Sequence, residues 1–337
     1  MGEQCVEDVI MGSGAMEQDL NGGQPVLLCP GQGAQAVGMG NAWAGASPAA
    51  RAVFDRADEI AGDRFDAPLS RICFQGPADV LNQTNVSQPA LFTCGVACHA
   101  ALVEANGPMA ASAAAGLSLG EYTALHLAGV FDFETGLELV MERGALMQAA
   151  AEASKGSMVA LMGPDEATAE AFCASTLAQL PEGEVLVPAN FNAPGQIVLS
   201  GSLDACEAAL GAAEEAGFRA KSLVVAGAFH SSLMAPAAGA MASCLSEAVF
   251  LEPRIPVWSN VSAAPHPVDD PEHIRQSLVE QITHPVRWAQ SCTRMIEAGS
   301  TLFLELAPGR VLKGLMRRTD RNAKVVTNDE PTPTPAE

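Results

Sequence analysis

The predicted elements between residues 154 and 225 constrain the fold of this chain most strongly. Short apolar runs predict strands at 157–162, 185–191, 196–200 and 220–225, and longer segments predict helices at 166–179 and 203–216. The resulting order, β-α-β-β-α-β, is that of the ferredoxin-like arrangement. We therefore expect a small ferredoxin-like subdomain at 154–225, inserted into the remaining chain.

The segments on either side alternate between apolar runs and helical patterns, which is typical of an α/β domain. Strands are predicted at 26–29, 109–115, 224–228, 257–260 and 301–305, and helices at 49–60, 88–106, 121–130, 133–152 and 233–249. We expect residues 25–153 together with 226–328 to form one large α/β subdomain.

Both ends of the chain have compositions typical of disordered segments. Residues 1–24 contain five acidic side chains and no Lys or Arg, which is unlike a signal or transit peptide. Residues 329–337 are rich in Pro and Thr and are acidic. We expect a disordered acidic extension at 1–24 and a disordered tail at 329–337.

Composition excludes several classes of function. The formal charge of −21 argues against nucleic-acid binding, which needs a basic face. No apolar run reaches the length of about 18 residues that would predict a membrane span. The nine cysteines form no CxxC pair and no Cys/His cluster with metal-ligand spacing. We expect reduced thiols, a cytoplasmic enzyme and no metal site.

One stretch departs from the acidic balance. Six basic residues and a single acid, Asp320, lie between residues 310 and 324. The basic residues are Arg310, Lys313, Arg317, Arg318, Arg321 and Lys324. The stretch is either a solvated helix end or a docking patch for an acidic partner, and the sequence does not decide between them.

The segment Gly116-Leu117-Ser118-Leu119-Gly120 matches G-x-S-x-G, the nucleophile elbow of α/β-hydrolase-like folds. Such an elbow is a tight turn from strand to helix that needs small residues around the serine. The turn holds the hydroxyl at a helix N-terminus, where backbone amides stabilise negative charge. A small apolar stretch precedes Ser118 and a predicted helix follows it. The match makes Ser118 a candidate nucleophile, although one motif can arise by chance.

A nucleophilic serine needs a base, and His230 is the best candidate of the six histidines. It ends the apolar run 224–229, so it would lie at the carboxyl end of a strand, where sites of α/β sheets gather. A structural histidine or a helix cap is the alternative interpretation.

Arg143 lies on the apolar face of the helix predicted at 133–152. The neighbours on this face at helical spacing are Gly136, Leu139, Val140, Leu146, Met147 and Ala150. A guanidinium there must find an anion, because an unpaired buried charge is costly. The anion is either an internal carboxylate or the carboxylate of a substrate, held by two hydrogen bonds.

The loop Pro30-Gly31-Gln32-Gly33-Ala34-Gln35 follows the first predicted strand. Its glycine spacing does not fit G-x-G-x-x-G, so nucleotide binding is the weaker interpretation. A loop at this position could instead supply a backbone amide to an oxyanion hole.

Taken together, these motifs resemble the malonyl-CoA:acyl carrier protein transacylases of fatty-acid synthesis and, more distantly, the acyltransferase domains of polyketide synthases. The resemblance spans about 25–321. Its motifs are Pro30-Gly31-Gln32-Gly33, Ser87-Gln88-Pro89-Ala90, Gly116-Leu117-Ser118-Leu119-Gly120-Glu121, Arg143-Gly144 with Met147-Gln148, Asn190-Phe191-Asn192-Ala193-Pro194-Gly195-Gln196, Phe229-His230-Ser231 and Glu305-Leu306-Ala307-Pro308-Gly309.

The resemblance implies roles for the matching positions in the chemical step. Ser118 would be the nucleophile and His230 its base, without an acidic third member. The main-chain carbonyl of Gln281 would orient the histidine, and the backbone amides of Gln32 and Leu119 would form the oxyanion hole.

It also implies roles in acyl binding. Arg143 would hold the malonyl carboxylate, and Asn192 and Met147 match positions near the acyl pocket. Phe229 before the histidine resembles the malonyl-type pattern, because a bulky ring crowds an α-methyl group. Two positions depart from the family: Leu117 stands where a histidine is frequent, and Ala307 replaces a common glycine. We expect both departures to be tolerated.

The expected activity is therefore transfer of malonyl from malonyl-CoA to acyl carrier protein for fatty-acid synthesis, without a metal or redox cofactor. The same chemistry could instead serve a polyketide pathway. A serine thioesterase or hydrolase shares the elbow but does not require Arg143. A non-catalytic homologue that only docks carrier proteins would not need Ser118, His230 and Arg143 together.

Overall fold

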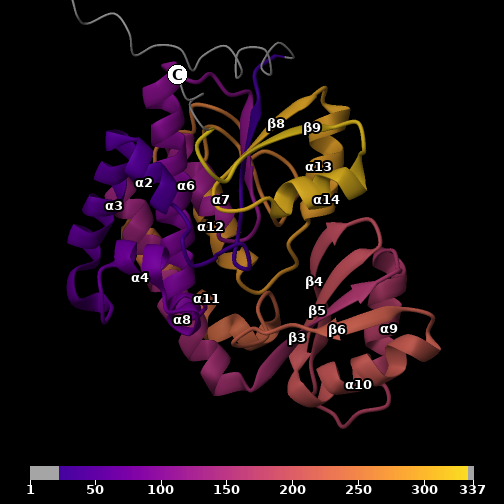
Figure 1. Ribbon diagram of the computed structural model, residues 1–337. Coiled ribbons are helices and arrows are strands. Elements are labelled where there is room, and N and C mark those ends of the chain that lie inside the picture. The colour runs from indigo at the N-terminus through magenta and orange to yellow at the C-terminus, as the bar shows by residue number, and fades with distance from the viewer. Residues whose placement is uncertain (1–22, 333–337) are drawn as a thin grey trace, which may run out of the picture.

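The computed structural model describes residues 23–332, which form two sheets with helices packed around them. Figure 1 shows the second sheet, with helices α9 and α10, as a separate unit below the C-terminal helices α13 and α14. The predicted extension at 1–24 lies almost wholly outside the described residues, as do the last five residues of the predicted tail.

The first sheet is parallel and has five strands in the order β7-β2-β1-β8-β9. Its strands are β1 (Val26–Cys29), β2 (Ala113–Gly116), β7 (Val257–Trp258), β8 (Leu302–Leu306) and β9 (Lys324–Asn328). Every residue of β1, β2 and β8 is buried, as expected for parallel strands covered on both faces.

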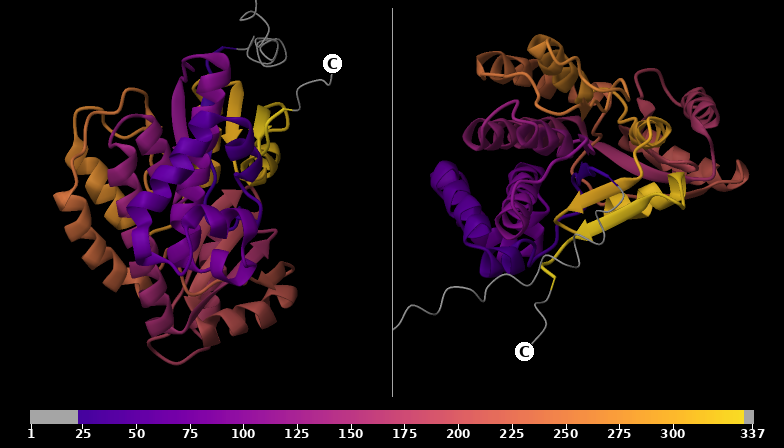
Figure 2. Two further views of the ribbon diagram at one scale, coloured as in Figure 1. Left: turned by 60° about the vertical axis from the view of Figure 1, so that its left-hand side comes forward. Right: turned by 90° about the horizontal axis from the view of Figure 1, so that it is seen from above.

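Alternate residues of these strands belong to two different cores. Leu27 packs with helices α3, α6, α7, α8, α11 and α12, whereas Val26 and Leu28 pack with α13 and α14 on the opposite face. Figure 2 shows the first group of helices on one side of the molecule and the C-terminal strands and α14 on the other. The large subdomain therefore has three layers, with the parallel sheet between two layers of helices.

The helices around this sheet have clear start signals. Ser47, Asp132 and Asp270 cap α3, α8 and α12 through their side chains, and Pro48 and Pro271 occupy the first helical position of α3 and α12. The bounds are α2 (Asn41–Ala46), α3 (Pro48–Ala61), α4 (Leu69–Gln75), α5 (Ala78–Leu81), α6 (Thr84–Asn106), α7 (Gly120–Leu127), α8 (Phe133–Ser154), α11 (Ala235–Glu247), α12 (Pro271–Gln281), α13 (Trp288–Glu297) and α14 (Val311–Thr319), with 3₁₀ turns at Gly62–Arg64 and Ser232–Met234.

The second sheet is antiparallel and has the order β4-β5-β3-β6. Its elements are β3 (Gly156–Met162), α9 (Glu166–Leu177), β4 (Leu186–Ala193), β5 (Gln196–Ser202), α10 (Leu203–Glu215) and β6 (Arg219–Ser222). They enclose a third apolar core of their own. The β-α-β-β-α-β order predicted from the sequence is confirmed, and the strand order is that of a ferredoxin-like sheet.

Within the described residues, only α6 is long and apolar enough to cross a membrane, and 83% of its most apolar window is buried inside the protein. It packs between α3 and α8. A helix that is apolar on all sides is expected at the centre of a large domain. The length and apolarity of α6 are thus those of a core helix.

Three details of the large sheet differ from the sequence prediction. No strand forms at 224–228, because the chain leaves the small sheet after Ser222 and crosses as a loop in which Val224 is fully exposed. β2 is confined to the last residues of the predicted 109–115 strand. β9 was not predicted: its sequence Lys-Val-Val-Thr-Asn begins at the last residue of the basic stretch and contains only two consecutive apolar residues.

The first residue of the predicted C-terminal tail is held by the fold. Asp329 accepts a 2.6 Å hydrogen bond from the Gly309 amide, and its carbonyl accepts one from Trp43 Nε1 at 3.1 Å. The ordered part of the chain therefore extends at least to this residue, beyond the boundary predicted at 328.

Candidate active site

Ser118 sits in a strained turn between β2 and α7. Its φ is +53°, a left-handed conformation that non-glycine residues rarely adopt. A Cβ on Gly116 would lie 1.9 Å from Gly120 backbone atoms, and a Cβ on Gly120 would lie 2.0 Å from the Cys29 carbonyl oxygen. The two glycines of the motif are therefore required by close backbone contact, as a nucleophile elbow demands.

The loops after three adjacent parallel strands meet at this turn. Gln32 follows β1, Ser118 follows β2 and Asn260 follows β7, and these strands are neighbours in the order β7-β2-β1. The register pairs Cys29 with Gly116 at the strand ends. Their carboxyl ends form the edge of an α/β sheet where ligand sites form.

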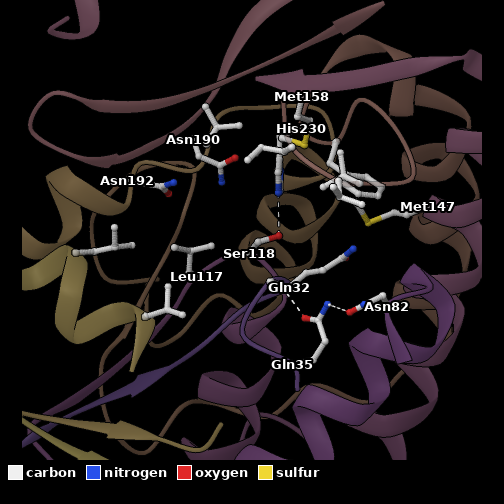
Figure 3. Close-up of a pocket in the computed structure, with 18 of the residues that line it drawn as sticks. Gln32, Gln35, Asn82, Leu117, Ser118, Met147, Met158, Asn190, Asn192 and His230 are labelled. Atoms are coloured by element: carbon white, nitrogen blue, oxygen red, sulfur yellow. Dashed lines mark hydrogen bonds between the residues drawn. The ribbon is translucent and has the colours of Figure 1, made fainter. Parts of the chain in front are cut away.

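The imidazole of His230 faces the Ser118 hydroxyl, as the dashed line in Figure 3 shows. His230 Nε2 lies 2.8 Å from Ser118 Oγ, and Nδ1 lies 2.7 Å from the main-chain carbonyl of Gln281. Because a carbonyl can only accept, Nδ1 carries the proton, and Nε2 is left to accept the proton of Ser118.

Burial and, after it, the nearby charge of Arg143 lower the pKa of His230 to about 4, against the opposing hydrogen bonds to backbone carbonyls. The imidazole is therefore neutral near pH 7 and can act as a base. His230 has a φ of +58° and lies in a loop. The sequence had placed it at the end of a strand, so its secondary structure differs from the prediction, although it does lie beside Ser118.

Arg143 on α8 is 1% exposed and touches the serine. Its Nη1 donates to Gln88 Oε1 at 2.6 Å, and its Nη2 donates to Gln281 Oε1 at 2.8 Å and to Ser118 Oγ at 3.1 Å. Its Nε has no hydrogen-bond partner among residues 23–332. Burial lowers the pKa of the guanidinium, partly offset by Tyr122 and Glu121.

No carboxylate lies within ion-pair distance of Arg143 in the part of the chain that the structure describes. Two amide oxygens and a hydroxyl accept hydrogen bonds from its two Nη groups, and none of these acceptors carries a formal charge. An arginine stays protonated in proteins, so this site attracts an anion. Of the two interpretations left open by the sequence, the structure favours an external carboxylate over an internal one.

The two backbone amides expected in an oxyanion hole are unoccupied. Neither Gln32 N nor Leu119 N donates a hydrogen bond to any described residue. Gln32 lines the cleft, and Leu119 directly follows the serine while its side chain is fully buried. Free amides on either side of a serine hydroxyl are what stabilises a tetrahedral oxyanion.

A cleft of about 470 Å³ opens over Ser118 and His230 between the two subdomains. The large subdomain supplies Gln32, Leu117, Arg143 and Met147, and the small subdomain supplies Met158, Asn190, Asn192, Gln196 and Val198. Figure 3 shows Asn190 and Asn192 on one side of Ser118, with Gln32, Gln35 and Asn82 on the other. A substrate in this cleft would contact both subdomains.

Asn192, Met147 and Phe229, the remaining residues expected near the acyl group, all line this cleft. The Asn192 Oδ1 atom is buried and has no hydrogen-bond partner within 23–332. Met147 contacts Gln88 through its sulfur at 3.5 Å. The structure thus brings together the side chains that the resemblance placed at the site, and the Gln281 carbonyl lies at His230 Nδ1.

Sequence reasoning missed four polar side chains around the dyad. Gln88 and the Gln281 amide hold Arg143, as described above. Asn260 accepts from the Ser118 amide at 2.6 Å and donates to the Gly116 carbonyl at 2.7 Å. Glu121 accepts from Gln281 Nε2 at 2.7 Å. Gln88 and Glu121 stood inside matched motifs, but nothing in the sequence indicated that Asn260 clamps the elbow.

Within the described residues, no group of three or more His, Cys, Asp or Glu side chains could hold a metal ion.

The chemistry that the site offers is acyl transfer through a serine activated by a neutral histidine, with an arginine for an acyl chain that ends in a carboxylate.

The protein family that matches this chain carries out the acyl transfer that the site geometry indicates. The acyl transferase domain family matches residues 26–333. The chain belongs to this family. It is 39% identical over 306 residues to the malonyl CoA-acyl carrier protein transacylase of Bacillus subtilis, covering 90% of this chain and 93% of that protein.

Other acyl transferases resemble the chain to a similar degree. The polyketide biosynthesis malonyl CoA-acyl carrier protein transacylase PksC of Bacillus subtilis is 38% identical over 299 residues, or 88% of this chain and 97% of that protein. The crystal structure of the transacylase from Clostridium perfringens matches with a TM-score of 0.84 at 33% identity, covering 92% of this chain and 94% of that one.

A malonyl-transacylase solved in complex with a type II polyketide acyl-carrier protein matches with a TM-score of 0.85 at 36% identity, covering 92% of this chain and 97% of that one. The family resemblance and the two-subdomain α/β fold expected from the sequence are confirmed.

Proposed function

We propose that this acyl transferase moves a malonyl group from malonyl-CoA to acyl carrier protein through an ester on Ser118. The observation that carries the proposal is the contact between Arg143 and the serine. A buried guanidinium without a described carboxylate partner lies 3.1 Å from the nucleophilic oxygen. A malonyl group attached to that oxygen would carry its free carboxylate within reach of the same guanidinium.

In the first half-reaction, Ser118 Oγ attacks the thioester carbonyl while His230 Nε2 takes the hydroxyl proton. The amides of Gln32 and Leu119 stabilise the oxyanion. When the carbon–sulfur bond breaks, His230 returns the proton to the coenzyme A thiolate, and the malonyl group remains on Ser118.

In the second half-reaction, the phosphopantetheine thiol of the carrier protein enters the same cleft. His230 takes the thiol proton, the sulfur attacks the ester carbonyl, and the oxyanion forms again between the two amides. Collapse of this intermediate breaks the bond to Ser118 Oγ, which regains its proton from His230. Each proton that His230 takes from Ser118 or from the thiol is returned in the same half-reaction. We therefore propose that the transfer needs neither a metal nor a redox cofactor.

Acyl selectivity follows from the lining of the cleft. Arg143 selects for a terminal carboxylate. Phe229, directly before the histidine and 6% exposed, crowds the position of an α-methyl group and favours malonyl over methylmalonyl. Met147 shapes the apolar part of the acyl pocket, and the unpartnered Asn192 Oδ1 accepts from an amide or hydroxyl of the thioester arm.

Helix α14 lies at the mouth of the cleft, and we assign it the docking of the carrier protein. Its Val311 and Leu315 line the cleft. The exposed basic side chains of this region are Arg310, Lys313, Arg317, Arg318 and Arg321, and none forms a salt bridge with a described residue. An acidic carrier protein bound there would place its prosthetic arm beside Ser118.

Fatty-acid synthesis is the pathway we favour, because several relatives at 39% identity are named malonyl CoA-acyl carrier protein transacylase without a polyketide pathway in the name. The polyketide transacylases described above support the alternative pathway, which uses the same site and chemistry. The eight described cysteines are free, and seven of them are buried, which supports a cytoplasmic location.

The proposal is tested by intact mass after brief mixing with malonyl-CoA, comparing the wild type with Ser118→Ala. We expect a gain of roughly 86 Da on the wild type alone, and its loss on addition of acyl carrier protein. Free malonate without an adduct would indicate a hydrolase. Intact malonyl-CoA without an adduct would indicate a protein that only docks carrier proteins.

A further inference from the structure

A buried carboxylate that does not line the cleft lies at the centre of the polar network around the dyad. Glu121, in the first turn of α7, is 1% exposed. Its Oε1 accepts from His266 Nε2 at 2.8 Å, and its Oε2 accepts from Gln281 Nε2 at 2.7 Å and from the Asn260 amide at 3.1 Å. Three donors therefore converge on this carboxylate.

These contacts determine the orientation of the Gln281 amide. Its Nε2 group donates to Glu121 Oε2 and to the Ser118 carbonyl at 3.0 Å, while its Oε1 accepts from Arg143 Nη2 at 2.8 Å. A rotated amide would set its oxygen against two acceptors and its NH₂ against a donor. All three hydrogen bonds would be lost in that orientation, and each would leave a buried polar group without a partner.

Among the described residues, Gln281 alone is hydrogen-bonded to Ser118, His230 and Arg143. Its main-chain carbonyl accepts from His230 Nδ1, and its side chain contacts the other two. When the side-chain amide of Gln281 rotates, its contact with Arg143 is lost, but its main-chain carbonyl still accepts from His230. The orientation of the amide therefore bears on Arg143 more than on His230.

The pairing with His266 explains why Glu121 stays in place. His266 is 2% exposed and reaches Glu121 from the turn after β7, and its Nδ1 has no partner among the described residues. A buried carboxylate is stable only when its oxygens are saturated with donors. His266 supplies the donor for the oxygen that faces away from Gln281, which leaves Oε2 free for Gln281 and Asn260.

We propose that Glu121, held by His266, is a positioning residue for acyl selection: it fixes the Gln281 amide so that its oxygen holds Arg143 in the geometry that binds the acyl carboxylate. The inference rests on the proposed function, in which Arg143 binds the malonyl carboxylate. A purely structural network would stabilise the fold without distinguishing between acyl groups.

The test compares adduct formation from malonyl-CoA and from acetyl-CoA in Glu121→Ala and Glu121→Gln. In Glu121→Ala the Gln281 amide is free to turn, so we expect kcat/KM for malonyl to fall about tenfold or more and that for acetyl about threefold or less. Glu121→Gln keeps an oxygen for Gln281 and Asn260, while His266 changes tautomer to accept from the new NH₂ group. This variant should restore the malonyl-to-acetyl ratio.

Equal losses for both acyl groups, or a Glu121→Gln variant that behaves like Glu121→Ala, would overturn the proposal. Asp58→Ala is the matched control, since it removes a carboxylate that binds Ser70 away from the cleft and should leave the ratio unchanged. If Glu121→Ala does not fold, Gln281→Met replaces it. That variant keeps the carbonyl for His230 and removes the oxygen that holds Arg143, so the same change in ratio is expected.

A crystal structure of the full-length Glu121→Ala variant separates this inference from the proposed function. We expect the Gln281 Oε1 atom to leave hydrogen-bond distance of Arg143 Nη2, and an unchanged pair would refute the inference. A wild type that forms no malonyl adduct refutes the proposed function instead, and the crystallographic result still decides whether Glu121 positions Arg143.

Discussion

Arg143 Nη2 and Ser118 Oγ are 3.1 Å apart, so in the proposed function the group that selects the acyl chain touches the atom that attacks it. Arg143 lies on α8 and Ser118 in the turn between β2 and α7, and the two meet because α8 passes beside that turn. In the proposed function, an acyl group with a terminal carboxylate would be held where its thioester carbonyl meets the serine. Acyl recognition and the chemical step would then use the same hydrogen-bonded residues.

Arg143→Ala should impair malonyl transfer selectively. Loss of a hydrogen bond to a charged group should raise the barrier for malonyl loading by about 1.5–3 kcal/mol, while acetyl loading, which makes no such contact, loses much less. The measurement is kcat/KM for adduct formation with both thioesters. Equal losses for malonyl and acetyl would show that Arg143 only supports the fold.

The rate of loading should be insensitive to mild acid. Because burial and, after it, the Arg143 charge lower the pKa of His230 to about 4, the base stays neutral well below its ordinary pKa of 6.5. Protonation of Nε2 abolishes the acceptor for the serine proton, so kcat/KM should be constant from neutral pH downward and decline only near pH 4.

The same profile measured with acetyl-CoA in Arg143→Ala provides the control. Removing the positive charge should raise the pKa of His230, so the acid limb should move to higher pH than in the wild type. A wild-type limb near the ordinary histidine value, or a limb that does not move in the variant, would contradict the assignment of these causes.

Asn260→Ala should impair loading of malonyl and acetyl alike. The side chain clamps the strained elbow through the Ser118 amide and the Gly116 carbonyl. Its removal leaves two buried backbone groups without partners, which should cost about 1–3 kcal/mol in the free energy of unfolding. Urea denaturation measures that loss, and the malonyl-to-acetyl ratio should stay at the wild-type value, unlike in Arg143→Ala.

Glu305→Ala should destabilise the protein through helix α14. The buried Glu305 carboxylate on β8 accepts from the amides of Leu312 at 2.7 Å and Lys313 at 2.8 Å, so it caps this helix from outside. Without it, the first turn of α14 loses both acceptors, and the free energy of unfolding should fall by about 1–3 kcal/mol. A variant as stable as the wild type would show that water replaces the carboxylate.

Charge reversal on α14 should weaken the use of carrier protein but not of malonyl-CoA. In Arg317→Glu/Arg318→Glu, we expect KM for the carrier to rise about threefold to tenfold at low ionic strength, and the difference to shrink as salt is added. Arg71→Glu on α4, which Figure 1 places among the helices on the opposite side, is the matched reversal. An unchanged KM in the double variant would remove α14 as the docking surface.

Local sequence patterns predicted much of the fold. Apolar runs and helical periodicity predicted the small subdomain element by element, because each of its predicted strands is a short apolar run and its two helices are longer segments between them. The nucleophile elbow could be predicted because a tight strand-to-helix turn tolerates only small residues around Ser118. Errors occurred where the local pattern and the tertiary context conflict. The apolar segment 224–228 crosses between the subdomains instead of pairing, and β9, which has only two consecutive apolar residues, pairs with β8.

The sequence by itself determined the serine, its glycines and an arginine that must find an anion, because steric contact and desolvation act on residues that are close along the chain. Only the tertiary structure decided what surrounds them. His230, Gln281 and Asn260 reach Ser118 from segments more than a hundred residues away, and their hydrogen bonds depend on where helices and loops end in space. The Glu121–His266 pair follows from packing alone, since no local pattern relates α7 to the turn after β7.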